Sequence, residues 1–405
     1  MRIWIRYLIG IALGMATALI LPFDNLQWSA ALSFITEIVV RIGRYSLLPF
    51  LFFSGIMAAY RLKSDGLLLR TTLWTVGTII ATSLLLTALG LVSILIVRLP
   101  RIPIAIERVN EIDSIDIQDL IKNIFPYSAF NSLTQDAFLL PTFVFALMIG
   151  FGCYIKHSNL KPLTTFFDAA SELFYNISSA MTDFFSAGIV FVMCSWTIQF
   201  RKVIKSGVFT PLFTMLLADF VILVVIIYPL ILKFLCKIRN PYKILYVSLV
   251  PFFTSFFSGD TNLSLLSEMR MGKERLGIRR RTNGFSFPLF SIFARGGTSL
   301  IVIISFVMIW RSYSTLSIEF FDMLSISLTA LALSFVLGNI PVGGTFTALT
   351  ILCTLYGRGM ETGHLLLKPA AVILGSFSAL FDAATAMFGC YIIANKTKTI
   401  ETHRS

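Results

Sequence analysis

The chain has 405 residues, of which 56% are hydrophobic and only 13% are charged. Soluble globular proteins carry about twice that fraction of charged residues, so the composition excludes an ordinary soluble domain. The net charge of +12 lies mainly in short loops, which is typical of the cytoplasmic loops of membrane proteins rather than of a nucleic-acid-binding surface. The five cysteines and three histidines show no metal-ligand spacing, so we predict neither a disulfide framework nor a metal site.

The first half of the chain contains apolar runs of the length that crosses a bilayer, about 20 residues each. We predict membrane-spanning helices at residues 5–22, 36–60, 72–97, 137–155, 172–197 and 207–236. The first run could pass for a signal peptide, but no cleavage site of small residues follows it, so a transmembrane helix is the better interpretation. The sequence therefore predicts an all-α polytopic membrane protein.

The second half differs because glycine, proline and small polar residues interrupt its apolar segments. The interruptions are SFFSGDTNLSLL (255–266), ARGGTS (294–299) and GNIPVGGTFTA (338–348). Broken backbone at membrane depth is tolerated only where protein buries it or a cavity adjoins it, and paired interruptions indicate the binding site of a transporter. The alternative is a set of structural kinks, which would explain one break more easily than three within about 90 residues.

Five segments share their residue pattern and their order with one known family. They are residues 124–152, 255–278, 285–300, 338–346 and 381–396. The chain resembles the dicarboxylate/amino acid:cation symporter family, which has the glutamate-transporter fold. The resemblance implies about eight transmembrane helices plus two re-entrant hairpins, an elevator-type transporter and a homotrimer.

The resemblance also implies a division of the chain into two parts. Residues 1–240 would form mainly scaffold and trimerisation helices, with the third helix at 72–97 joining the transport part. The transport core would be residues 241–396, made of a hairpin (241–278), a broken helix (282–311), a second hairpin (323–358) and a last helix (361–395), followed by a cytoplasmic tail (397–405).

By the same resemblance, the ligand would lie between the hairpin tips, the broken helix and the last helix. The implied substrate-binding residues are Asp260, Thr261, Asn262, Arg295, Thr298, Ile340, Gly344, Ser378 and Asp382. The positions implied in coupling a cation or a proton are Thr82, Ser83 and Asp382.

The chain departs from the family at several of these positions. The family's Asn, Met and Asp of the broken helix fall on Ala294, Arg295 and Gly296, its sodium-binding aspartate falls on Ala386, and its arginine for acidic side chains falls on Ser378. A sodium site needs several oxygen ligands at once, as other hard cations do. We therefore predict no cofactor and favour coupling to protons or to nothing, with sodium as the remaining possibility.

Arg295 stands out on physical grounds alone, since it lies between two apolar runs. A charge at the bilayer centre costs at least about 2.5–3.5 kcal/mol, so it needs a partner or a cavity. Asp382 and Asp260 are the expected partners. Arg295 would act either as a tethered cation that also binds a ligand carboxylate or as half of a purely structural ion pair. For Asp260, an ordinary helix cap is as good an interpretation as a ligand role.

These observations predict a symporter-like secondary active transporter of a small organic solute, either a carboxylate or an amino acid. It would be a multi-pass protein of the bacterial inner membrane with both termini in the cytoplasm, and its partners would be the solute and membrane lipid, with no nucleic acid. One alternative is a sodium-coupled dicarboxylate/amino acid symporter with rebuilt cation sites, and another is a non-transporting sensor or anion channel on the same fold. We predict no enzyme, because the chain shows neither a combination of nucleophile, base and orienting group nor a nucleotide-binding loop.

Overall fold

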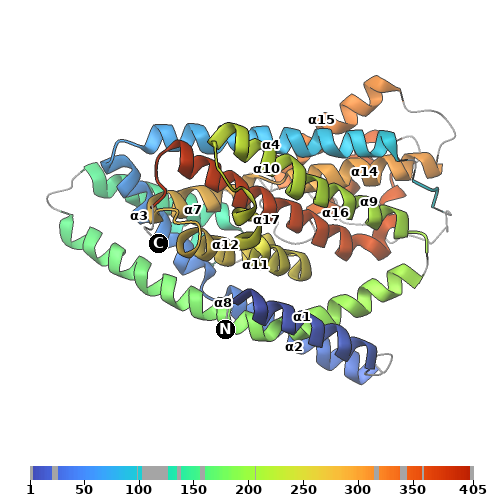
Figure 1. The fold of residues 1–405 in the computed structure, drawn as a ribbon, viewed down its shortest axis with the longest axis horizontal. Helices are drawn as coiled ribbons and strands as arrows, with labels where there is room; N and C mark the ends of the chain where they lie inside the picture. Colours follow the sequence, from blue (N-terminus) through green and yellow to red (C-terminus); the bar gives the residue numbers. More distant parts are fainter. Residues whose placement is uncertain are drawn as a thin grey trace.

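The structure is a computed structural model in which the helices run roughly along one direction and form an elongated body (Figure 1). It describes residues 3–20, 26–97, 99–102, 126–134, 138–155, 160–205, 207–313, 319–337, 344–357 and 360–401. All regular secondary structure in these ranges is helical, and one isolated β-bridge joins Ile278 to Ile400.

The helices of the first half follow the predicted apolar runs, with one additional short helix at Ala129–Thr134 and two runs that differ in extent. They are α1 (Ile3–Ile20), α2 (Leu26–Arg44), α3 (Leu47–Ser64), α4 (Leu68–Ile96), α6 (Ala129–Thr134), α7 (Leu139–Ile155), α8 (Lys161–Lys205), α9 (Thr210–Val221), η1 (Ile222–Ile227) and α10 (Tyr228–Cys236). The run predicted at 36–60 is divided between α2 and α3. The run predicted at 172–197 is the middle of α8, whose 45 residues give a length of about 68 Å, because its more polar ends continue the helix beyond the apolar stretch.

The second half contains pairs of helices separated by the predicted interruptions. Its elements are α11 (Tyr242–Ser258), α12 (Thr261–Glu274), α13 (Arg280–Phe293), α14 (Gly296–Tyr313), α15 (Phe320–Val336), α16 (Gly344–Tyr356), η3 (Gly363–Ala370) and α17 (Ala371–Lys396). The first interruption separates α11 from α12, and the second separates α13 from α14. The third lies between α15 and α16, and its residues 338–343 fall outside the described ranges.

The prediction of an all-α polytopic membrane protein is confirmed. Seven helical spans of the described chain are long and apolar enough to cross a membrane, and some of them join consecutive labelled helices, such as α2 with α3 and α13 with α14. Helices α7, α11, α15 and α16 are shorter and also apolar. Both the length and the apolar composition of these helices match what a bilayer requires.

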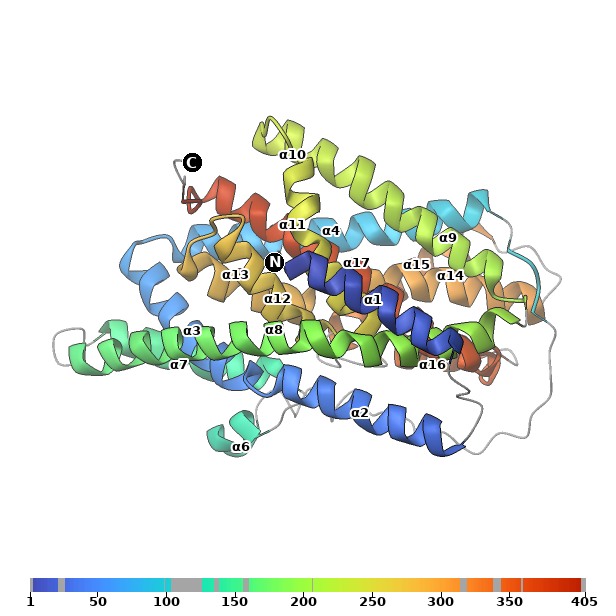
Figure 2. The ribbon, with the colours of Figure 1, turned by 60° about the horizontal axis from the view of Figure 1, so that its bottom comes forward.

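The second half of the chain forms the centre of the molecule. The apolar stretch of α13–α14 is 94% buried, whereas that of α1 is only 28% buried. Figure 1 shows α8 with α1 and α2 along one edge and α11, α12, α16 and α17 in the middle, and Figure 2 shows α2 beside α8 from a second direction. A helix that is apolar on all sides, as α14 is, belongs inside such a bundle.

Close helix packing in this fold depends on glycines at specific contacts. A Cβ atom at Gly150 of α7 would lie 2.6 Å from the backbone oxygen of Ile56 and 2.8 Å from Cβ of Ala59, both on α3. A Cβ atom at Gly152, on the same helix, would meet nothing within 4 Å. These two glycines therefore form a matched pair for testing how tightly α7 packs on α3.

We expect Gly150→Ala to lower the free energy of unfolding by about 1–3 kcal/mol, because the added methyl group overfills the contact between α7 and α3. Gly152→Ala should be neutral or slightly stabilising, because alanine favours the helix and the space is open. Denaturation of the two purified variants in the same detergent measures the difference. Equal stability of the two variants would contradict the packing of α7 on α3.

Candidate functional site

The centre of the candidate site is the break between α13 and α14. The backbone amides of Ala294 and Arg295 donate to Phe290 O (2.9 Å) and Phe293 O (3.0 Å), which ends α13. A Cβ atom at Gly296 would lie 3.0 Å from Cα of Ser83 on α4. A Cβ atom at Gly297 would lie 2.6 Å from the backbone oxygen of Ser378 on α17. The two glycines thus allow α4 and α17 to close on the break from two sides.

Arg295 forms an ion pair with Asp382 inside the protein. Its Nη1 atom lies 3.7 Å from Oδ2 of Asp382, and the two side chains are 7% and 5% exposed. The other carboxylate oxygen, Oδ1, accepts a hydrogen bond from the backbone amide of Gly297 (2.8 Å). Asp382 therefore joins a cation to the first turn of α14, where the helix dipole also favours negative charge.

Asp260 caps α12 and also forms an ion pair. Its Oδ1 atom accepts a hydrogen bond from the backbone amide of Asn262 (2.8 Å). Its Oδ2 atom lies 3.3 Å from Nη1 of Arg44, the last residue of α2. The residue before it, Gly259, has a φ of 63°, which suits glycine at the end of α11.

Sequence reasoning leaves Arg44 out of the site, although a signal was present. Arg44 lies within the apolar stretch Gln27–Ser64, which is long enough to span a membrane. The rule that draws attention to Arg295, a charge surrounded by apolar residues, applies to Arg44 as well. Its partner on α12 is 216 positions away in the chain, so only the fold reveals the pairing.

A cavity of about 20 Å³ lies where the tip of the α11–α12 hairpin, the break and the start of α16 meet α17. Five of the implied site residues contribute to its lining: Thr261, Arg295, Thr298, Gly344 and Ser378. The other lining residues, which lie outside the implied set, are Gly259, Leu337, Thr345, Gly375 and Ala379. Apart from Thr345, which has a hydroxyl group, these residues are glycine or apolar and carry no chemical signal in a sequence. In this conformation the cavity has room for about one water molecule.

The remaining implied residues lie beside the cavity or outside the described chain. Asp260, Asn262 and Asp382 are buried next to the lining residues, and Ile340 lies outside the described ranges. On α4, the hydroxyl of Thr82 donates to Thr78 O (2.7 Å). Oγ of Ser83 is buried without a hydrogen-bond partner in the described structure.

The hydroxyl groups at the cavity link α14 to α17. Oγ1 of Thr298 and Oγ of Ser378 lie 2.9 Å apart. Among the residues that the structure describes, no group of three His, Cys, Asp or Glu side chains could hold a metal ion. The cavity thus offers hydroxyl groups, helix N-termini and a paired arginine to a ligand.

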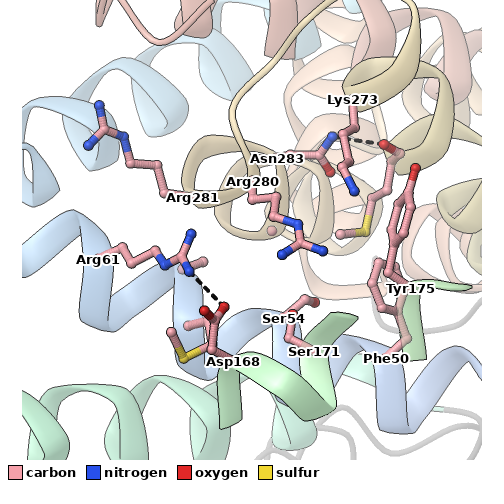
Figure 3. Close-up of a pocket in the computed structure, with 14 residues that line it drawn as sticks. Phe50, Ser54, Arg61, Asp168, Ser171, Tyr175, Lys273, Arg280, Arg281 and Asn283 are labelled. Atoms are coloured by element: carbon pink, nitrogen blue, oxygen red, sulfur yellow. Dashed lines mark hydrogen bonds and ion pairs between the residues drawn. The ribbon is translucent and has the colours of Figure 1, made fainter. Parts of the chain in front are cut away.

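A second cavity lies where α3, α8, α12 and α13 meet (Figure 3). Arg61 points toward Asp168, with Nη2 and Oδ1 2.6 Å apart, and Nζ of Lys273 lies 3.5 Å from the ring centre of Tyr175. The cavity is at the start of α13, about 20 Å along that helix from the break. Each of its charged groups already has a protein partner, since Arg280 and Arg281 pair with Glu172 and Asp65 beside the cavity, so we interpret it as a structural junction between helices.

We expect Arg295→Met to lower the free energy of unfolding by about 3–5 kcal/mol, because it leaves the buried carboxylate of Asp382 without its cation. The double variant Arg295→Met/Asp382→Asn should recover part of that loss by removing the unpaired charge. Thermal unfolding of the purified proteins measures both effects.

Arg41→Met is the matched control for this experiment. Arg41 pairs with Glu37 at an exposed position, where the two side chains are 77% and 60% exposed. Its replacement should change the stability by no more than about 0.5 kcal/mol. If Arg295→Met is as stable as Arg41→Met, the ion pair at the break contributes nothing to stability.

Comparison with known proteins gives a match across nearly the whole chain. Residues 3–396 match the family described as "Sodium:dicarboxylate symporter family". "Neutral amino acid transporter A" of Bos taurus is 26% identical over 219 residues, which cover 53% of this chain and 40% of that protein. "Neutral amino acid transporter B(0)" of Oryctolagus cuniculus is 25% identical over 388 residues, which cover 85% of this chain and 70% of that protein. "Excitatory amino acid transporter 1" of Homo sapiens is 23% identical over 210 residues, which cover 52% and 38%.

Proposed function

The chain belongs to the sodium:dicarboxylate symporter family, and on that basis we propose that it is a secondary active transporter of an amino acid or a related small carboxylate. The observation that carries the proposal is the break between α13 and α14, where the Arg295–Asp382 pair lies beside a small polar cavity. Membership of a symporter family also confirms the prediction that the chain is not an enzyme.

The lining of the cavity supports a solute that carries a carboxylate. Helices α12 and α16 begin at the cavity, with Thr261 and Gly344 as their first residues, and the N-terminus of a helix attracts negative charge. The hydroxyls of Thr298 and Ser378 add groups that can donate or accept hydrogen bonds. Ser378 stands where the family resemblance places an arginine for acidic side chains, so we propose a preference for amino acids with neutral side chains.

The size of the cavity supports a mechanism that involves opening. A volume of about 20 Å³ holds a water molecule but no amino acid, so the hairpin α11–α12 or the pair α15–α16 must move away to admit the solute. We propose that the transport core (241–396), together with residues 72–97, then moves as an elevator against the scaffold helices of residues 1–240 in a homotrimer. In this assignment the Arg44–Asp260 pair joins scaffold to core and must separate during transport.

The position of Arg295 supports our proposal for the ion that drives transport. A permanent cation at the break replaces a bound sodium ion as the counter-charge of Asp382, so the driving ion would be a proton, or none. We also propose that the protein lies in the inner membrane of a bacterium, with both termini in the cytoplasm.

Uptake by purified protein in liposomes tests the proposal. The probes are labelled L-alanine, L-glutamate and succinate, each measured with an inward sodium gradient, an inward proton gradient and no gradient. We expect L-alanine uptake that rises when the outside is more acidic than the inside and that does not respond to sodium. Empty liposomes and liposomes with the Arg295→Met variant are the controls.

Other outcomes of this experiment would overturn specific parts of the proposal. Uptake that requires sodium would mean that cation sites have been rebuilt from other residues. A stronger response to L-glutamate or succinate than to L-alanine would contradict the preference that we assign to Ser378. Anion currents without uptake of any probe would favour a channel on the same fold.

A further inference from the structure

Glu268 is a buried carboxyl group that neither the predicted site nor the ion pairs account for. It lies on α12 and is 2% exposed. Its Oε2 atom has no hydrogen-bond partner in the part of the chain that the structure describes. A carboxylate buried in this way is costly unless it is paired or protonated.

The hydroxyl of Ser264 is placed to accept a hydrogen bond from a protonated form of this carboxyl group. Its Oγ atom lies 2.8 Å from Oε1 of Glu268 and 2.9 Å from Thr261 O. A serine hydroxyl has one hydrogen to donate and lone pairs to accept with. If that hydrogen goes to the carbonyl of Thr261, which can only accept, Glu268 must carry a proton and donate it to Ser264.

The charges around the break also favour the protonated form of Glu268. Two arginines, Arg44 and Arg295, lie among three buried carboxyl groups. Asp260 has Arg44 and a backbone amide, and Asp382 has Arg295 and a backbone amide. In the described structure Glu268 forms neither an ion pair nor a hydrogen bond to a backbone amide, so it is the carboxyl group whose ionisation would leave an excess negative charge in the centre of the protein.

Charged and titratable groups reach Glu268 from the elements around it. Arg295, in the break between α13 and α14, attracts the ionised form, and Asp382 of α17 repels it. The thiol of Cys390, also on α17, lies within electrostatic reach. On α12 itself, Asp260 is engaged with Arg44 of α2, and Arg270 with Asp183 of α8.

We propose that Glu268 is the group that carries the coupling proton, an assignment that rests on the proposed transport function. Glu268 and Ser264 sit on the hairpin that forms one side of the cavity, and Arg295 interacts electrostatically with both Glu268 and Asp382. When the carboxylate of a solute enters the cavity, the added negative charge near Arg295 makes it harder for Glu268 to lose its proton. After the solute leaves and water enters the opened cavity, the proton passes from the carboxyl oxygen to that water, and Arg295 stabilises the carboxylate that remains until the cavity closes again.

This arrangement couples the transport of the solute to the transport of a proton in the same direction. A solute that increases the proton affinity of Glu268 must itself bind more tightly when Glu268 is protonated, because such coupling is reciprocal. The proton and the solute then move together through the membrane, as in a symporter. The Arg295–Asp382 pair would be the element that transmits the effect between them.

Infrared difference spectroscopy of the purified protein in lipid tests the assignment without any solute. At neutral pH we expect an absorption band of a protonated carboxyl group that is lost in Glu268→Gln. Asp219→Asn is the matched control, because Asp219 is also buried but lies on α9, hydrogen-bonded to Ser93 (2.5 Å). That variant should keep the band that Glu268→Gln loses. No loss of a band in a folded Glu268→Gln variant would overturn the proposal.

A second variant keeps the test decisive if Glu268→Gln does not fold. Ser264→Ala removes the hydrogen-bond partner of Glu268 while leaving the carboxyl group in place. The band should shift in frequency, because the hydroxyl no longer contacts it. A band with unchanged frequency in Ser264→Ala would mean that it arises from another group, and the assignment to Glu268 would be wrong.

Transport in liposomes supplies the functional readout, with labelled L-alanine, L-glutamate and succinate as probes. An inward gradient of one pH unit allows about tenfold accumulation when one proton accompanies one neutral or zwitterionic solute. We expect Glu268→Gln to accumulate no probe, so that the inside-to-outside ratio falls to about one, while Asp219→Asn keeps the accumulation of the parent protein. Tenfold accumulation by Glu268→Gln would overturn the proposal. If the parent protein transports no probe, the proposed function fails, and the infrared band still decides whether Glu268 holds a proton.

Discussion

The ion pair between Arg295 and Asp382 is the interaction on which the centre of this protein depends. It places a permanent cation inside an apolar stretch that is 94% buried, where an unpaired charge would be severely unfavourable. The same carboxylate holds the first turn of α14 through the amide of Gly297. Asp382 of α17 thus balances the charge of Arg295 and also accepts a hydrogen bond from the N-terminal turn of α14. Gly296 and Gly297 let α4 and α17 approach the break closely enough for these contacts.

The broken elements of the second half share one physical solution. Each break exposes a helix N-terminus, and in both described cases an aspartate accepts a hydrogen bond from the first turn while an arginine balances its charge. The protein thus supplies its own cations at the centre of the bundle. Glu268 is the buried carboxyl group beside the break that forms no ion pair in the described structure. In our proposal a proton neutralises it, whereas arginines neutralise Asp260 and Asp382.

Much of the fold and part of the candidate site were predictable from the sequence. The apolar runs and the interruptions at 255–266 and 294–299 correspond to helices and to breaks between them, because a bilayer allows little else. Five of the nine implied substrate-binding residues line one cavity. Arg44 and Glu268 were missed because neither falls on a position that the family resemblance marks.

The sequence by itself determined the helical class, the places where helices break and the membership of a transporter family. These depend on hydrophobicity, glycine and proline, and short residue patterns, all of which are local. Only the tertiary structure decided which carboxylate pairs with which arginine. Asp260 was an expected partner of Arg295, but the nearer cation is Arg44, which α2 brings to the tip of the hairpin. Pairings between residues so far apart in the chain depend on how the helices pack, and therefore no local pattern can specify them.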